Sequence, residues 1–242
     1  MNAYLYAIVE RLPPAWRGSA AGVNGAPVTA RKLGDLIVVS SPMSDVPVGN
    51  PRTLARHHDV VASMMDAEAV LPFRYGVAVA AAELEPWVSE RRPVIDASLG
   101  LVRGCIEMNV KLLRLDCTVD RQVGGRTPRG TNGDDGEPGD QDLRELGDHL
   151  VDRAGLLDWR YRPAGRGGNV VASVAFLVPR ADLSDFLARI APVASRAAGV
   201  AVVPTGPWPA YSFVPTFDRL PLSRISDARD ARDARASERR AG

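Results

Sequence analysis

A run of residues without apolar side chains interrupts the chain near its middle. After Val123 the sequence continues as GGRTPRGTNGDDGEPGD (124–140), which is rich in glycine and aspartate. Such a segment buries too little apolar surface to offset the entropy lost on ordering. We therefore expect a flexible linker at 121–141 between two small domains, 1–120 and 142–217. A disordered, charged tail is expected at 218–242, where Asp-Ala-Arg occurs three times.

The overall composition is that of a soluble globular protein and excludes several functions. Of the 242 residues, 45% are hydrophobic and 24% are charged. The 30 basic and 29 acidic residues nearly cancel, whereas phosphate contacts require a basic excess. Nucleic acid is therefore not an expected partner. The sequence has neither a signal peptide nor an apolar run of about 18 to 20 residues, so we expect a cytoplasmic protein without a lipid-membrane partner.

Hydrophobic periodicity in the first half predicts alternating strands and helices. Asn50 can cap a helix that has Pro51 at its first position, and a second helical pattern covers 80–105 with a break near Pro93. The expected strands are 4–9, 36–40, 73–79 and the alternating segment around 108–112. The resulting order, β-β-α-β-α-β, predicts an N-terminal ferredoxin-like α/β sandwich.

The second half predicts a C-terminal α+β domain. Apolar residues recur at helical spacing over 143–157 and again over 183–190. Between these two helices, 159–162 and 170–178 are expected to form a hairpin, and 200–203 is expected to be the last strand. The fold class expected for the whole chain is therefore α/β (α+β) in two small domains.

No motif of an active site, cofactor site or metal site is found. The sequence lacks a nucleophile elbow, a zinc-protease motif, a phosphate-binding loop and a dinucleotide fingerprint. His57 and His58 are adjacent on a predicted helix and project about 100° apart, so we interpret both as half-exposed helix positions. We expect a protein that is not an enzyme and has no cofactor or metal.

Two aromatic segments are candidates for binding a partner. In 71–76 an arginine lies between two aromatic residues of a predicted strand, and it either forms a structural ion pair or contacts a partner. In 205–213 two prolines stiffen a segment whose aromatic side chains either anchor an interface or cover the core. The candidate partner-binding residues are Phe73, Arg74, Tyr75, Trp208, Tyr211 and Phe213.

Six sequence segments, in order, resemble the gas vesicle F/L family. They are YLYAIV (4–9), LGDLIVVSSP (33–42), VLPFRYG (70–76), GLVRGCIEMNVKLL (100–113), AFLVPR (175–180) and TGPWPAYSFV (205–214). The resemblance implies a two-domain α/β protein that takes part in gas vesicle assembly and is located in the gas vesicle or cytoplasm. It implies as partners the hydrophobic shell subunit, whose aggregation the protein would limit during nucleation, and other gas vesicle accessory proteins. It implies no catalytic residues.

The middle of the chain departs from the family pattern, and other functions stay open. Family members continue after the strand containing E-M-x-V-K into a helix beginning G-x-x-Y-L and a long helical arm. Here the Gly/Asp segment occupies that place. The alternative is a small-molecule-binding or regulatory ferredoxin-like module without catalysis. A hydrolase or transferase is a third reading, which the absence of a nucleophile and base pattern opposes.

Overall fold

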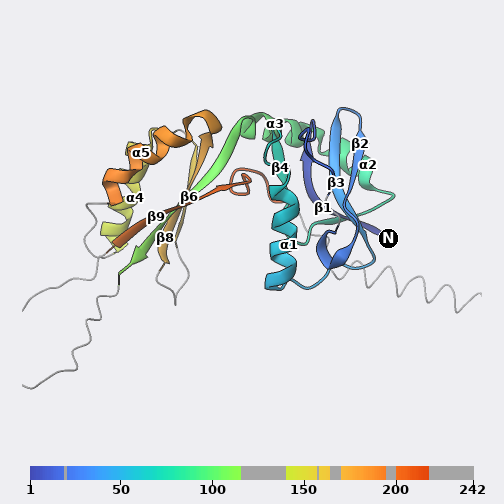
Figure 1. The fold of residues 1–242 in the computed structure, drawn as a ribbon, viewed down its shortest axis with the longest axis horizontal. Helices are drawn as coiled ribbons and strands as arrows, with labels where there is room; N and C mark the ends of the chain where they lie inside the picture. Colours follow the sequence, from blue (N-terminus) through green and yellow to red (C-terminus); the bar gives the residue numbers. More distant parts are fainter. Residues whose placement is uncertain (19–20, 116–139, 157, 164–169, 195–199, 218–242) are drawn as a thin grey trace, which may run out of the picture. The chain divides into compact units, whose positions relative to one another are not determined.

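A computed structural model describes residues 1–18, 21–115, 140–156, 158–163, 170–194 and 200–217 (Figure 1). The chain forms two compact units, one made of Met1–Arg103 and Val214–Gly242 and the other of Gly104–Phe213. Unit 1 is therefore built from two separate pieces of sequence. The expected linker at 121–141, apart from residues 140 and 141, lies outside the described residues, and so does the whole expected tail at 218–242.

Unit 1 contains an antiparallel sheet with β1 at its centre. Among the described residues the strand order is β2-β3-β1-β4, and β5 also pairs with β1. The strands are β1 (Asn2–Val9), β2 (Thr29–Leu33), β3 (Leu36–Met43), β4 (Val70–Pro72) and β5 (Ala78–Ala80). The helices are η1 (Val23–Gly25), α1 (Pro51–Ala62), α2 (Leu84–Glu90) and α3 (Arg92–Val102). From Tyr4 to Val9, β1 is completely buried, so neither of its faces contacts solvent there.

The helix predicted from Asn50 and Pro51 begins as expected. The Asn50 side chain accepts a hydrogen bond from the Thr53 amide at 3.0 Å, and the Asn50 amide donates to the Thr53 hydroxyl at 3.0 Å. This capping box satisfies two amides that a helix start would otherwise leave unpaired. The break expected near Pro93 is also confirmed, because α2 ends at Glu90 and α3 begins at Arg92.

Unit 2 has the β-α-β-β-α-β order of a ferredoxin-like fold. Among the described residues its sheet has the order β7-β8-β6-β9, and every neighbouring pair is antiparallel. The elements are β6 (Cys105–Arg114), α4 (Asp140–Ala154), β7 (Trp159–Pro163), β8 (Val170–Pro179), η2 (Arg180–Asp182), α5 (Leu183–Ala194) and β9 (Val200–Trp208). Figure 1 shows α4 and α5 side by side against this sheet.

The two faces of the second sheet differ in what covers them. Phe176 of β8 contacts Phe186 of α5 with 5.3 Å between ring centroids, which identifies the face beneath the helices. Met108 lies opposite Phe176 in the register, and Val110 lies opposite Val174, so all four share this face. Side chains alternate along a strand. The neighbouring residues Glu107, Asn109 and Lys111 therefore belong to the opposite face, which we call the open face.

The structure confirms the mixed α+β class with two antiparallel sheets but divides the chain at a different place. The expected boundary kept 108–112 in a first domain ending at 120, whereas β6 is an interior strand of the second sheet. The ferredoxin-like order consequently belongs to unit 2, and unit 1 has the order β-β-β-α-β-β-α-α. The strand expected at 73–79 is wrong, because β4 ends at Pro72 and β5 begins only at Ala78. β2 was not among the expected strands, and its residues are mostly exposed.

The position of β6 predicts how the protein responds to a cut in its middle. Cleavage at a protease site inserted within 124–139 would leave β6 on one fragment and β7, β8 and β9 on the other. Because β6 pairs with β8 on one side and β9 on the other, the two fragments should stay associated. Gel filtration should show one peak in native buffer and two in denaturant. Two stable halves that separate in native buffer would contradict this sheet order.

Candidate functional site

The segment 73–76 forms a turn between β4 and β5 of unit 1. The Phe73 amide donates to the carbonyl of Tyr6 at 2.8 Å, and Gly76 has a φ of +92°, which glycine adopts readily. The Phe73 side chain is 1% exposed and packs against the rings of Trp87 and Phe217, at centroid distances of 6.0 and 5.1 Å. Phe73 is therefore a core residue, and it fixes the start of the turn.

A buried hydrogen-bond chain fixes the rest of this turn. The Gly76 amide donates to the Tyr4 hydroxyl at 3.3 Å, and this hydroxyl lies 2.9 Å from Nδ1 of His57. Nε2 of His57 lies 2.8 Å from the Phe73 carbonyl oxygen. That carbonyl can only accept, so Nε2 carries the proton and Nδ1 accepts from Tyr4. We call this chain the Tyr4–His57 network; it connects the turn to both β1 and α1.

His57 is neutral in this network. Burial lowers its pKa from 6.5 to about 4, and the hydrogen bond to the Phe73 carbonyl opposes this shift only partly. The side chain is 3% exposed. The interpretation of both adjacent histidines as half-exposed is therefore right for His58 and wrong for His57.

Arg74 and Tyr75 lie at the surface of the same turn. Arg74 is exposed, and within the described part of the chain no carboxylate lies within 4.0 Å of it, so these residues give the structural ion-pair interpretation no support. The half-buried Tyr75 donates from its hydroxyl to the Pro47 carbonyl at 3.0 Å. A Cβ atom at Gly49 would lie 3.4 Å from the Tyr75 ring and 3.9 Å from Leu54. We call Tyr75 and the exposed Leu54 and Val48 beside it the Tyr75 patch.

A buried carboxylate holds the second aromatic segment in unit 2. Glu107 is 3% exposed, although it lies on the open face of the sheet. Its Oε2 accepts from the Ser212 amide at 2.7 Å, and its Oε1 accepts from the Ser212 hydroxyl at 2.8 Å and from the Asn109 side chain at 2.9 Å. Three hydrogen bonds thus satisfy the carboxylate and fix the segment 209–213 on the sheet.

The aromatic residues of this segment differ in exposure. Phe213 is 6% exposed and lies beneath the Arg160 guanidinium, whose carbon is 5.3 Å from the ring centroid. Tyr211 is half-buried, and its pKa lies well above the usual range. Burial is the larger cause of this shift, and the nearby Glu107 charge is the second. Trp208 is 37% exposed. Two residues before it, Gly206 has a φ of +133°, and a Cβ there would lie 3.0 Å from the Glu107 carbonyl oxygen, so this position requires glycine.

The structure therefore separates the six candidate residues by accessibility. Arg74 and Trp208 are accessible, Tyr75 and Tyr211 are half-buried, and Phe73 and Phe213 are core residues. The residues that position them, Tyr4, His57 and Glu107, were not among the candidates. In the sequence Glu107 resembles any polar residue on the solvent side of a strand, and only the later segment 209–213 covers it.

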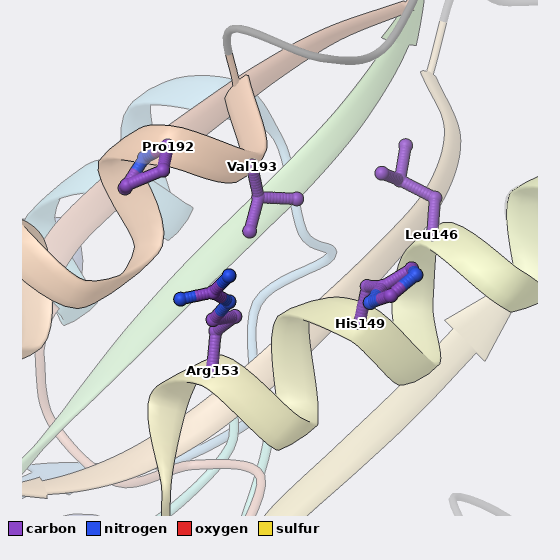
Figure 2. A pocket seen from close by; sticks show the side chains of 5 residues that line it. All are labelled: Leu146, His149, Arg153, Pro192 and Val193. Carbon is purple, nitrogen blue, oxygen red and sulfur yellow. The ribbon is translucent and has the colours of Figure 1, made fainter.

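One pocket lies between α4 and α5 of unit 2 (Figure 2). Its volume is about 260 Å³, and it is lined by Leu146, His149, Arg153, Pro192 and Val193. Figure 2 shows Arg153 extending from α4 toward the helix that carries Val193. Ligand pockets usually measure about 300 to 1,000 Å³ and combine an apolar lining with several convergent polar groups. This small site gives little support to the small-molecule alternative.

The described residues offer neither a metal site nor a membrane-spanning helix. They contain no group of three or more His, Cys, Asp or Glu side chains that could hold a metal ion. None of their helices has the length and apolar character that a bilayer-spanning segment needs.

The Tyr4–His57 network predicts a defined pH dependence of stability. The unfolded chain takes up a proton at His57 near pH 6.5 and the folded protein only near pH 4, so the contribution of neutral His57 is lost between these values as the pH falls. From about pH 7.5 to about pH 4.5, wild type should lose about 2 to 3 kcal/mol more unfolding free energy than His57→Gln. Urea titrations at both pH values measure this difference. Equal losses in the two proteins would contradict a neutral, buried His57.

Comparison with known proteins places the chain in a family. The model of the family "Gas vesicle synthesis protein GvpL/GvpF" matches residues 2–154 and 149–215. No curated protein matches the chain. The crystal structure of GvpF from Anabaena sp. PCC7120 is similar, with a TM-score of 0.67 at 13% identity, and the alignment covers 90% of this chain and 99% of that one.

The crystal structure of GvpF from Microcystis aeruginosa is similar as well. Its TM-score is 0.65 at 14% identity, and the alignment covers 88% of this chain and 98% of that one. At such low identity these structures show a common fold. The family model, however, spans nearly all of the described residues of both units. The chain belongs to the GvpL/GvpF family of gas vesicle synthesis proteins.

Proposed function

We propose that this protein is a non-catalytic assembly factor that binds the hydrophobic gas vesicle shell subunit and limits its aggregation during nucleation. Family membership supports a part in gas vesicle synthesis. The observation that carries the proposal is the pair of accessible side chains, Arg74 and Trp208, each presented by a segment that buried hydrogen bonds hold in place. Other gas vesicle accessory proteins are further partners in this proposal, and its site of action is the cytoplasm or the gas vesicle itself.

Rigid support makes these side chains suitable contacts. Aromatic residues and arginine are enriched among the residues that dominate binding energy, and a preorganised side chain loses less entropy on binding. Trp208 directly precedes the segment fixed by Glu107, and Arg74 lies inside the turn fixed by the Tyr4–His57 network. Next to Arg74, the Tyr75 patch supplies apolar surface for a hydrophobic partner. Phe73, Tyr211 and Phe213 contribute by supporting the two segments.

The two segments supply no visible route to catalysis. Both ring nitrogens of His57 take part in the buried network, and the Glu107 carboxylate accepts three hydrogen bonds from its own unit. His57 cannot act on a substrate without breaking these bonds, and Glu107 is buried. A binding function uses the same residues without such a change.

Replacement of Trp208 tests the contact in unit 2. Trp208→Ala should weaken binding to the shell subunit by about 2 kcal/mol, roughly thirtyfold, as expected for a central aromatic contact. Trp159→Ala is the matched control, because Trp159 has the same exposed fraction of 37%. Binding is measured by titration against immobilised shell subunit, and urea unfolding of both variants corrects for lost stability. Equal effects of the two substitutions on binding would argue against Trp208 as a contact.

Replacement of Arg74 tests the contact in unit 1. Arg74 is exposed and forms no ion pair among the described residues, so Arg74→Ala should change stability by less than about 0.5 kcal/mol. We expect it to weaken shell-subunit binding, and to reduce suppression of light scattering when shell subunit is diluted from denaturant. Arg11→Ala, at another exposed arginine, should leave both measurements unchanged. If Arg74→Ala also behaves as wild type, Arg74 is not part of the binding surface.

A further inference from the structure

Three basic side chains lie together on the open face of the second sheet. Ser173 of β8 lies opposite Lys111 of β6 on one side and opposite Arg162 of β7 on the other. Two residues further along β8, Ala175 lies opposite Asn109 of β6 on one side and opposite Arg160 of β7 on the other. We call Lys111, Arg160 and Arg162 the basic face.

Contacts on both sides of β7 show which way these side chains point. A Cβ atom at Gly147 of α4 would lie 3.5 Å from the Tyr161 ring, so Tyr161 is on the helix side of the sheet. Its neighbours Arg160 and Arg162 therefore project from the opposite side. The position of Arg160 over Phe213 agrees, because Phe213 directly follows Ser212, which Glu107 holds on the open face.

Within the described part of the chain, the basic face has no counter-charge within hydrogen-bonding reach. Lys111, Arg160 and Arg162 are all exposed, and among the described residues none has a carboxylate within 4.0 Å. Glu107 lies on the same face, but its oxygens already accept from Ser212 and Asn109. The next carboxylate along β7 is Asp158, which precedes the strand at the end away from Arg162. Lys111 and Arg162 thus present positive charge to solvent.

We propose that the basic face binds an acidic, extended segment of a partner protein. Arg160 and Arg162 are two residues apart on one strand, about 7 Å, and Lys111 lies two strands from Arg162, about 10 Å. Carboxylates at alternate positions of an extended peptide repeat at about the same 7 Å. The complementarity therefore favours an acidic peptide whose side chains alternate. This site is distinct in chemistry from the contact with a hydrophobic shell subunit and does not depend on it.

Nucleic acid fits the same surface less well. Sequence-independent binding to nucleic acid combines a continuous basic track with aromatic side chains that stack on bases. Here three cations face solvent, while the aromatic Phe213 is buried beneath Arg160. The accessible Trp208 of β9 pairs with Glu107 of β6, and β9 is three strands away from the two arginines of β7. The chain as a whole carries a formal charge of only +1.

The experiment uses the full chain and a fluorescent peptide in which Glu alternates with Ser. Wild type should bind this peptide at low salt, and binding should weaken as salt rises. The double variant K111E/R162E should bind at least about tenfold more weakly. The matched control, R153E/R189E, makes the same change in net charge at exposed positions of α4 and α5, and its affinity should stay within about twofold of wild type. Urea unfolding checks that both variants remain folded.

Several results would overturn the proposal. Absence of binding by wild type, or equal loss in the two double variants, would show that the basic face is not a specific site. Tighter binding of single-stranded DNA of equal charge would assign the face to nucleic acid. A dimer in sedimentation velocity that K111E/R162E abolishes would assign it to a second copy of this chain. Shell-subunit binding by K111E/R162E is measured in parallel, so failure here is distinguishable from failure of the assembly function.

Discussion

A polar group taken out of water must find a hydrogen-bonding partner, and both aromatic segments of this protein depend on that requirement. In unit 1 the His57 imidazole is buried and bridges the Tyr4 hydroxyl and the Phe73 carbonyl. In unit 2 the Glu107 carboxylate is buried and accepts from Ser212 and Asn109. Removing one partner from such a group leaves the other unsatisfied, which costs about 1 to 3 kcal/mol. Each segment is therefore held in place by a cost of about two to five times thermal energy.

This confinement explains why the two segments are so distinctive as sequence. VLPFRYG contains a buried phenylalanine, a carbonyl used by His57 and a glycine with positive φ at Gly76. TGPWPAYSFV contains a glycine at Gly206 that has no room for a Cβ and a serine that contacts Glu107 through two atoms. Phe73, Gly76, Gly206 and Ser212 are thus letters of the resemblance that also meet structural requirements. Arg74 and Trp208 differ from these four, because their side chains are accessible.

Local features of the fold were predictable from sequence, whereas partner choice between distant segments was not. The cap formed by Asn50 and Thr53 involves residues three apart, so the sequence pattern indicates it directly. The alternation in β6 correctly predicts a strand, but nothing in it states whether the strand joins the sheet before it or the one after it. The burial of Glu107 was likewise not predictable, because Ser212 is 105 positions away. In 73–79 the aromatic and apolar residues favoured a strand, yet the hydrogen bonds to His57 and Tyr4 hold a turn.

The route of the chain through unit 1 has a consequence for biosynthesis. Phe217 lies against Phe73 and Trp87 and is 8% exposed. It belongs to the second piece of unit 1, whereas the first piece ends at Arg103. A ribosome therefore completes the whole of unit 2 before it supplies the last ring of the unit 1 core. Until then Phe73 and Trp87 lack that covering ring, and a chain that terminates early at about Phe213 would retain an intact second sheet together with an incomplete first core. Complete packing of the unit 1 core therefore waits until residues 214–217 have been synthesised.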